Sequence, residues 1–287
     1  DFDDEKFTMS PEFSRAVRKV FCDWYHDGLI YRGKRIVNWC PVCGTAISDD
    51  EAEYHDEKGR LWFLRYPLTE PVDGIEYITV ATTRPETMLG DTGVAVSPED
   101  PEKAKLVGKT VMLPIVNREI PIFSDWHVDK NFGTGFVKVT PAHDPNDFAM
   151  GQTHNLEQIN ILDEHAHIVD GYGEFSGMDR DEAREAIVKW FDEHGLLDHI
   201  EDLEHSVMHC YRCDTALEPW LSEQWFVAVD KLKGPATKVV KDGEVKFYPE
   251  RWTQTYLTWM DNLKDWCISR QLWWGHRIPV FYCEDCG

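Results

Sequence analysis

The sequence predicts an α+β fold, in which a mostly antiparallel, β-barrel-like domain with packed helices is inserted into flanking segments through a four-cysteine knuckle. Three observations support this prediction. Short β-rich segments separated by turn residues fill the middle of the chain, an amphipathic helix follows them, and matching Cys-x-x-Cys motifs stand on either side. With 287 residues, the chain is long enough for one large domain or two ordinary ones.

The composition limits the classes of function. A net charge of −22 argues against nonspecific binding of nucleic acid over the whole surface, but it leaves room for a nucleic-acid end in a local pocket. No run of 18 apolar residues occurs, so we expect no membrane span. Six of the eight cysteines stand in Cys-x-x-Cys pairs, which indicates metal ligation in a reducing cytoplasm rather than a disulfide framework.

The first expected element is a helix that opens at Ser10-Pro11, with serine as N-cap and proline as the first helical residue. It should end at Gly28. Its apolar face consists of Phe13, Val17, Val20, Phe21 and Trp24. Cys22, within this helix, is expected to be a buried small apolar residue. A short strand over residues 34–39 then leads into the first cysteine pair.

The first two cysteine pairs lie in an internal repeat. Residues 40–47 and 210–217 both read Cys-x-x-Cys-x-Thr-Ala followed by an aliphatic residue. Cys40, Cys43, Cys210 and Cys213 can together bind a tetrahedral zinc ion. A closed four-cysteine site leaves no open position for water, so we expect this Zn²⁺ to be structural. The alternative is two unrelated reduced pairs.

The pairing of the two knuckles predicts the domain organisation. If they meet, residues 44–209 must leave and return at one place, as an inserted domain does. We therefore divide the chain into residues 1–48, an inserted domain of residues 49–205, and residues 206–287. A third pair, Cys283 and Cys286, lacks two further ligands in this sequence and is expected to be half of a second zinc site.

The inserted domain is rich in strand signals. Five short segments of β-branched and aromatic residues are separated by turn residues, at 61–66, 77–82, 111–116, 119–123 and 135–140. An amphipathic helix capped by Asp179 follows and should end at Gly195. Beyond the second knuckle, another helix is expected over residues 253–263.

Residues 133–147 are especially rich in functional groups. Pro141 ends the strand, and His143, Asp144 and Asp147 follow within a few positions. Asp144 before a proline is equally a helix start, in which Asp144 is the N-cap and Asp147 favours the helix dipole. From this segment alone, helix capping and a substrate site are about equally supported.

A second polar turn leaves the strand over residues 77–82. It carries three threonines, an arginine and a glutamate: Thr82, Thr83, Arg84, Glu86 and Thr87. Threonine hydroxyls can position a substrate or a water, and an arginine can hold a phosphate or a ribose. The alternative is an ordinary strand exit with Pro85 as the breaker, and for this segment alone that alternative is better supported.

Four motifs carry the resemblance to a known family. They are Asn38-Trp-Cys-Pro41, Thr82-Thr-Arg-Pro-Glu-Thr87, residues 133–147, and the segment from Asp265 to Pro279, which contains Leu272-Trp-Trp-Gly-His-Arg277. With these motifs the chain resembles, over essentially all its residues, the middle of the class I valyl-tRNA synthetases around the editing insertion, the CP1 domain. Residues 272–277, and Arg84 with Glu86, favour the valyl over the isoleucyl pattern.

The resemblance implies editing by a domain inserted into a class I, Rossmann-type catalytic domain. Threonine and valine are isosteric, so an apolar pocket cannot exclude threonine by size, and a second site must clear it. The expected reaction hydrolyses the ester that joins threonine to the 3′ end of tRNA(Val), and the expected protein is a cytoplasmic monomer. The family's two ATP-binding signatures are absent here, so ATP and Mg²⁺ would serve only the full-length enzyme in ligating valine.

The resemblance also implies roles for the stretch at residues 133–147. Asp147 would bind the α-ammonium of the substrate, for which a carboxylate is the natural partner. Thr140 and Asp144 would test for the threonine hydroxyl. Lys138 would help to hold the terminal adenosine or its phosphate. His143 would help to bind the substrate in a structural or orienting role rather than as a base.

The remaining implied roles fall on the second turn and on one aromatic residue. Arg84 would act with the lysine on the adenosine or its phosphate. Thr82, Thr83 and Thr87 would order the carbonyl and the attacking water, and Phe132 would stack on the adenine.

Three alternatives remain open from the sequence. One is a zinc-dependent hydrolase or deaminase, which would need an open metal site with histidine or glutamate ligands. Another is a non-catalytic zinc-ribbon module that binds RNA or protein. Within the family, the alternative is an isoleucyl editing fragment that clears valine.

Overall fold

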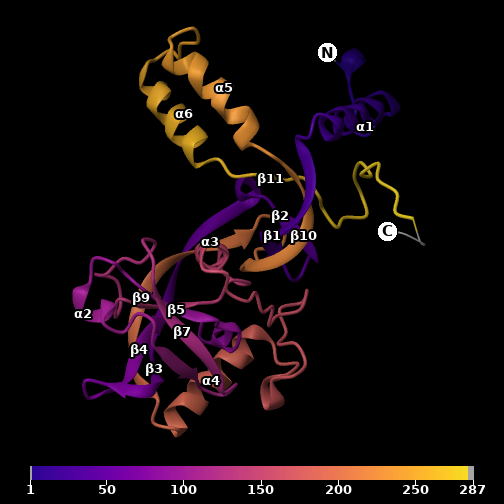
Figure 1. Ribbon diagram of the computed structural model, residues 1–287. Helices are drawn as coiled ribbons and strands as arrows, with labels where there is room; N and C mark the ends of the chain where they lie inside the picture. The colour runs from indigo at the N-terminus through magenta and orange to yellow at the C-terminus, as the bar shows by residue number, and fades with distance from the viewer. Residues whose placement is uncertain (1, 284–287) are drawn as a thin grey trace. The chain divides into compact units, whose positions relative to one another are not determined.

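The longest strand, β3 (Ala52–Val72), organises the larger of two units in the computed structural model, which describes residues 2–283. β3 pairs antiparallel with β4 (Ile75–Thr82), with β6 (Thr110–Leu113) and with β9 (Leu197–Cys210). The ladder with β9 runs from Ala52 opposite Cys210 to Leu64 opposite Leu197. Figure 1 shows β3 and β9 side by side along this ladder.

The remaining strands extend the sheet in the order β4-β3-β6-β7-β5-β8. These are β7 (Arg118–Ser124), β5 (Gly93–Val96) and β8 (Phe136–Val139). Among the pairings of the described residues in this sheet, only β5 with β7 is parallel. The two ends of the order, β4 and β8, lie against each other, so the sheet curls as a barrel does. The predicted α+β class with a mostly antiparallel sheet is therefore confirmed.

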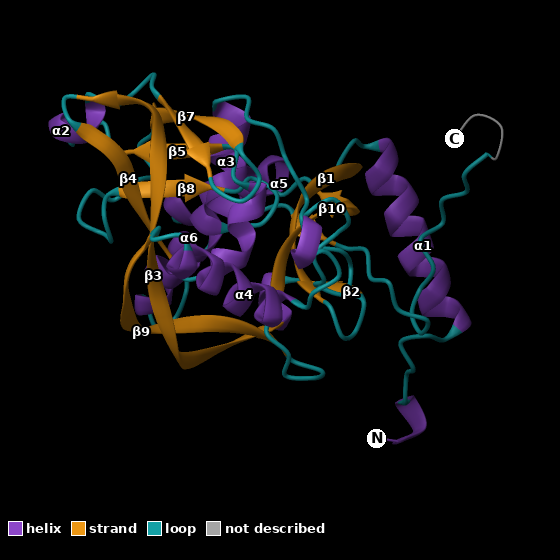
Figure 2. Ribbon diagram, turned by 90° about the horizontal axis from the view of Figure 1, so that it is seen from below, coloured by secondary structure: helices purple, strands orange, loops and turns teal. Residues whose placement is uncertain are grey.

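Helices and 3₁₀ turns connect the strands of the larger unit. They are η2 (Asp49–Glu51), η3 (Pro85–Gly90), α2 (Pro101–Ala104), α3 (Pro145–Thr153), η4 (Gly173–Phe175) and α4 (Arg180–Glu193). Of these, α3 lies beside β8 and α4 beside β9 (Figure 2). α4 buries Ala183, Ile187 and Phe191, which recur at helical spacing, against a core that includes Leu64 and Tyr66. The helix predicted after Asp179 is thus confirmed, with Asp179 as its N-cap.

The smaller unit combines residues 1–35 with residues 223–287. It contains η1 (Phe2–Asp4), α1 (Pro11–His26), α5 (Asp230–Lys241), α6 (Arg251–Asn262) and β11 (Trp266–Cys267). α5 and α6 lie side by side (Figure 1). The chain passes from one unit to the other in β1 (Ile30–Cys40) and in β10 (Glu218–Val227). Within the larger unit β1 pairs with β2 (Thr45–Ile47), and within the smaller unit β10 pairs with β11.

The expected helices of the smaller unit are present, with one correction. α1 starts after Ser10 and stops before Gly28, whose φ of +68° suits glycine. Cys22, however, is exposed, so the prediction that it is buried is wrong. In α1 only Phe21 is buried, and Cys22 follows it by about 100° around the helix, which turns its side chain to the surface.

The two units divide after residues 35 and 222, so both cysteine motifs at 40–43 and 210–213 lie within the larger unit. The prediction from the sequence divided the chain after residues 48 and 205, and the assignment of residues 49–205 as a separate functional domain stays a prediction. Within residues 2–283, no helix is long and apolar enough to cross a bilayer.

Candidate active site

The two polar turns singled out in the sequence meet in the larger unit. One follows β4 and contains η3, and the other follows β8 and leads into α3. Lys138, on β8, donates a hydrogen bond from Nζ to Oγ1 of Thr87, on η3, over 2.8 Å. Thr87 in turn donates to the backbone oxygen of Arg84 over 3.0 Å. This chain of bonds fixes the turn after β4 against the end of β8.

A buried carboxylate, Asp91, lies at the centre of this contact. It accepts hydrogen bonds from Lys138 Nζ at 3.1 Å, from Thr140 Oγ1 at 2.6 Å and from the Tyr66 hydroxyl at 2.8 Å. Burial raises the pKa of Asp91, and the ammonium group of Lys138 opposes that rise. Lys138 and Thr140 are thereby held in fixed positions.

Asp91 and Tyr66 were not identified from the sequence. Asp91 is the only charged residue within residues 88–96, which are otherwise uncharged and buried throughout. A lone charge in such a run would have been the available signal, because charged residues are rarely buried without a partner.

Asp144 caps the helix, as one of the two interpretations predicted, whereas the carboxylate of Asp147 does not bind the N-cap amide. Asp144 Oδ1 accepts from the N–H groups of Asn146 and Asp147, at 2.7 and 3.1 Å. Asp147 points back toward the strand, where its Oδ2 accepts the N–H of Thr140 at 2.8 Å. Burial and the neighbouring Asp144 carboxylate raise the pKa of Asp147 to about 7. The turn therefore places a carboxylate with near-neutral pKa, that of Asp147, at the end of β8.

Arg84 belongs to a buried ion-pair network. Its Nη2 donates to Glu218 Oε1 at 2.6 Å, its Nε to Glu86 at 3.2 Å, and its Nη1 to the backbone oxygen of His143 at 3.0 Å. Arg184, from α4, also binds Glu86 with two hydrogen bonds of 2.8 and 2.9 Å. The guanidinium of Arg84 thus connects the turn after β4 to β10 and to the turn after β8.

The other predicted residues surround these two clusters. His143 is buried, and its Nε2 accepts the N–H of Ile161 at 3.0 Å. Burial, with the charges of Arg84 and Lys138, holds the pKa of His143 well below its usual value, so the ring is neutral at neutral pH. Thr82 Oγ1 accepts the N–H of Arg84 at 3.0 Å. Thr82 thus has a partner within its own turn, whereas the ring of His143 is held by Ile161, beyond α3.

Thr83 and Phe132 lie toward the surface. Thr83 is partly exposed, and the Phe132 side chain is 56% exposed. The loop that carries Phe132 approaches β4 closely, since a Cβ added at Gly133 would lie 2.9 Å from the Cβ of Ala81. Phe132 is therefore an exposed aromatic ring on a loop that packs beside the end of β4.

The four cysteines of the two knuckles lie together. Sγ of Cys213 is 3.5 Å from Sγ of Cys40 and 3.6 Å from Sγ of Cys43, and Cys210 completes the group. Zinc–sulfur bonds of about 2.3 Å in a tetrahedron require sulfur atoms about 3.8 Å apart, so these residues fit a zinc ion. Cys283 is exposed, and Cys286 lies outside the described residues.

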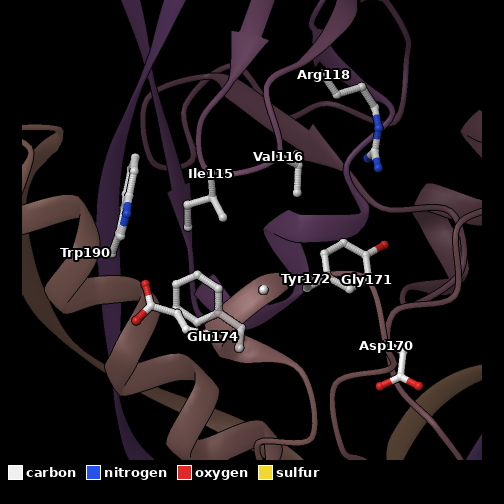
Figure 3. A pocket seen from close by; sticks show the side chains of 10 residues that line it. Ile115, Val116, Arg118, Asp170, Gly171, Tyr172, Glu174 and Trp190 are labelled. Carbon is white, nitrogen blue, oxygen red and sulfur yellow. The ribbon is translucent and has the colours of Figure 1, made fainter.

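A separate cavity of about 590 Å³ lies between the β6–β7 turn, the loop at residues 170–175 and α4. Figure 3 shows Arg118 and Tyr172 on one side of it and Trp190 with Glu174 on the other. None of the predicted site residues lines it. Arg118 Nη1 donates to the backbone oxygens of Leu89 and Asp91 at 3.2 and 3.0 Å, so one wall of this cavity supports the segment that carries Asp91.

Comparison with known sequences places the chain in a family. The family model of class I tRNA synthetases (I, L, M and V) matches residues 1–287, and the chain belongs to this family. The resemblance to the valyl enzymes is confirmed by relatives named valine–tRNA ligase. That of Thermotoga maritima is 58% identical over the whole chain, and that of Clostridium tetani is 56% identical, also over the whole chain.

The chain spans about a third of the length of these relatives, 33% of the first and 32% of the second. Among solved structures, a ternary complex of an Agrobacterium radiobacter K84 leucyl-tRNA synthetase with tRNA and LeuAMS is 19% identical. It aligns over 98% of this chain and 36% of its own, with a TM-score of 0.39.

Proposed function

We propose that this chain is the editing portion of a valyl-tRNA synthetase and that the joined turns hydrolyse threonine from mischarged tRNA(Val). The observation that carries this proposal is the meeting of the two turns through Lys138 and Thr87. It brings the cluster of threonines after β4 and the aspartates after β8 to one place, where a polar amino acid could be recognised. The whole-length similarity to valine–tRNA ligases supports the choice of amino acid.

In this proposal Asp147 binds the α-ammonium of the threonyl ester. The Thr140 N–H fixes its carboxylate, and a pKa of about 7 allows it to be ionised at and above neutral pH. Thr140 and Asp144 read the hydroxyl of threonine, which valine lacks. A site built to bind a hydroxyl rejects the analogue without one, because its buried polar groups would be left unpaired.

Water is the proposed nucleophile, ordered by the hydroxyls of Thr82, Thr83 and Thr87 around the ester carbonyl. The proton it loses passes to solvent or to the departing ribose oxygen. His143 is neutral, but its Nε2 already accepts the Ile161 N–H, so we assign it an orienting role. Phe132 is the proposed stacking surface for the terminal adenine, since it is exposed beside the end of β4.

The two cationic side chains, Lys138 and Arg84, are held in fixed positions at the site. Lys138 and Arg84 were predicted to hold the adenosine or its phosphate. Both are bound to buried carboxylates, Lys138 to Asp91 and Arg84 to Glu218 and Glu86. We propose that Lys138 presents its charge from within this cluster and that Arg84 chiefly positions the turn after β4.

The remaining parts of the proposal concern cofactors and partners. A structural Zn²⁺ bound by Cys40, Cys43, Cys210 and Cys213 would hold the two knuckles together, so that residues between them leave and return at one place. The partner is the 3′ end of tRNA(Val) carrying threonine, and the chain acts as a monomer in the cytoplasm. Valine ligation with ATP and Mg²⁺ belongs to the full-length enzyme.

The decisive experiment compares the deacylation of Thr-tRNA(Val) and Val-tRNA(Ile) by this chain. We expect hydrolysis of the first at a rate at least tenfold above the second and above the uncatalysed rate. Asp147→Ala should abolish it, while Asp170→Ala, at an acidic residue of the separate cavity, should retain it. Preference for Val-tRNA(Ile) would indicate isoleucyl editing instead.

Two further outcomes decide between the other classes of function. No hydrolysis of either substrate, together with binding of tRNA, would indicate a non-catalytic tRNA-binding module. X-ray absorption that reports four sulfur ligands around zinc would exclude a zinc-dependent hydrolase, which needs an open position with nitrogen or oxygen ligands.

A further inference from the structure

A cluster of histidines and acids lies on the β3–β9 ladder, next to the second knuckle. The register places Glu53 opposite His209 and His55 opposite Val207. Because alternate residues of a strand share one face, Glu53, His55 and Glu57 lie on the same face as His209. The cluster is separate from both polar turns, and the proposed hydrolysis uses none of its members.

Three of these side chains hold ligand atoms close together. Asp214 Oδ1 lies 3.4 Å from Nδ1 of His209 and 3.5 Å from Nδ1 of His55. The two imidazole rings stack with centroids 4.4 Å apart. One ligand atom from each of the three residues lies within 4.8 Å of the others. A tetrahedral ion with bonds of about 2.0–2.1 Å requires ligand atoms about 3.3–3.4 Å apart, so two of the three distances between ligand atoms are already close to this length.

The surroundings of His209 favour a cation at this point. Its Nε2 lies 2.8 Å from Glu57 Oε1, and a carboxylate on the far nitrogen is the usual orienting partner of a metal-bound histidine. Its Nδ1 donates a hydrogen bond to the backbone oxygen of Asp214 at 2.8 Å, and an ion bound at Nδ1 would replace that proton. The imidazole is mostly buried, while the Asp214 side chain is largely exposed, which leaves a path for an ion from solvent.

We propose that His55, His209 and Asp214 form a second metal site, which binds a divalent ion of the zinc class and completes its coordination with water. Two imidazoles and a carboxylate suit Zn²⁺ and similar first-row ions rather than Ca²⁺ or Mg²⁺, which prefer all-oxygen sites. On binding, each histidine supplies a neutral nitrogen, and any proton on that nitrogen is released to solvent.

The two metal sites would share one segment of chain. His209 precedes Cys210, and Asp214 follows Cys213 in a left-handed conformation with φ of 59°. The N–H of Asp214 donates to the backbone oxygen of Cys210 at 2.8 Å. An ion bound by His209 and Asp214 would therefore connect the two residues that flank the knuckle turn at residues 210–213. Through His55 it would also connect this turn to β3.

The number of metal ions bound per chain tests this proposal. It is measured in the 287-residue chain carrying Cys283→Ser and Cys286→Ser, so that the third cysteine pair binds no metal. Zinc bound per chain is measured after equilibration with buffered Zn²⁺, and the absorption of the Co²⁺-substituted protein identifies the ligands. We expect two ions per chain. The first should give thiolate-to-cobalt bands, and the second should add only weak ligand-field bands.

Variants assign the second ion. The His55→Ala variant should bind one ion and retain the thiolate bands. The Asp214→Asn variant should bind the second ion with an affinity at least about tenfold lower. His165→Ala is the matched control, an exposed histidine outside the cluster, and it should bind two. The proposal would be overturned if the parent chain bound only one ion. It would also be overturned if His55→Ala and Asp214→Asn both bound two ions with unchanged affinity. If His55→Ala loses the thiolate bands, the knuckle has been damaged, and Asp214→Asn decides.

Discussion

Lys138 Nζ donates a 2.8 Å hydrogen bond to Oγ1 of Thr87, a residue 51 positions earlier in the chain. Thr87 lies in the turn after β4, and Lys138 lies on β8 just before the turn that leads into α3. Each turn by itself is well explained as a strand exit or a helix cap. The bond joins the turns, and both residues are buried. A pair of capping turns has no need for a buried lysine between them, whereas a recognition site for a polar substrate needs fixed charges.

The first prediction concerns Asp91, the carboxylate that holds Lys138. Asp91→Asn should destabilise the larger unit by about 3–5 kcal/mol, because it leaves a buried ammonium without its counter-charge. Chemical unfolding at neutral pH measures this loss. In conditions where the variant stays folded, hydrolysis of Thr-tRNA(Val) should also fall, since Lys138 and Thr140 lose their shared acceptor.

Tyr66→Phe is the control for this prediction. It removes only the 2.8 Å bond from the tyrosine hydroxyl to Asp91 and preserves the ring in the core. We expect a loss of about 1 kcal/mol and little change in hydrolysis. Equal losses in the two variants would show that the charge of Asp91 contributes nothing beyond one hydrogen bond.

A second prediction separates positioning from substrate binding at Arg84. Arg84→Lys should cost about 1–3 kcal/mol, because a lysine cannot reproduce the forked contacts with Glu218 and Glu86 and leaves a buried acceptor unpaired. If the role of Arg84 is positioning, the dissociation constant for tRNA should stay within about twofold while kcat for deacylation falls. A variant of full stability that binds tRNA much more weakly would instead assign Arg84 to the substrate.

Local signals in the sequence were sufficient for part of the site. The strand that ends at Pro141 and the cap at Asp144 can be read from neighbouring residues, because alternation and capping depend on spacings of two to four positions. The paired knuckles could be predicted because their flanks repeat. The contacts that assemble the site have no such signal, since Arg84 and its partner Glu218 are 134 residues apart.

Two strands of the sheet also lack a local signal. β9 was not predicted, because Asp198, Glu201, Asp202 and Glu204 place charges on both faces of the strand and remove the apolar alternation. Its residues form a strand because they pair with β3 over most of the length of β9. β5 is a buried run of only four residues, too short to distinguish from a loop or a helix turn by period.

A third prediction concerns the four-cysteine site. Cys213→Ser should reduce the zinc bound there and lower the unfolding temperature of the larger unit by more than about 5 °C, since each kcal/mol lost costs roughly 2–4 °C in a unit of this size. Calorimetry and metal analysis measure the two effects. Cys22→Ser, at an exposed lone cysteine, should change neither. An unchanged unfolding temperature in Cys213→Ser would mean that the knuckles meet without a metal.

The last prediction follows from the pKa of Asp147, which burial and Asp144 raise to about 7. A carboxyl whose pKa is raised on folding stabilises the fold fully below its ordinary pKa, and that stabilisation is lost as the pH rises through about 7. Asp147→Asn keeps an uncharged group that can still accept the Thr140 N–H. Its unfolding free energy should therefore match that of the parent chain at about pH 4, near the ordinary pKa of an aspartate, and exceed it at pH 8.

The expected difference at pH 8 is on the order of 1–4 kcal/mol, since each pKa unit corresponds to about 1.4 kcal/mol. Urea unfolding at the two pH values measures it. The deacylation rate should change with pH in the opposite direction to stability. In the parent chain the rate should rise through about pH 7 as Asp147 ionises, and in Asp147→Asn it should stay low at every pH. If the substitution lowers stability equally at both pH values, the Asp147 carboxylate is ionised over the whole pH range. It would then stabilise the fold rather than bind a substrate.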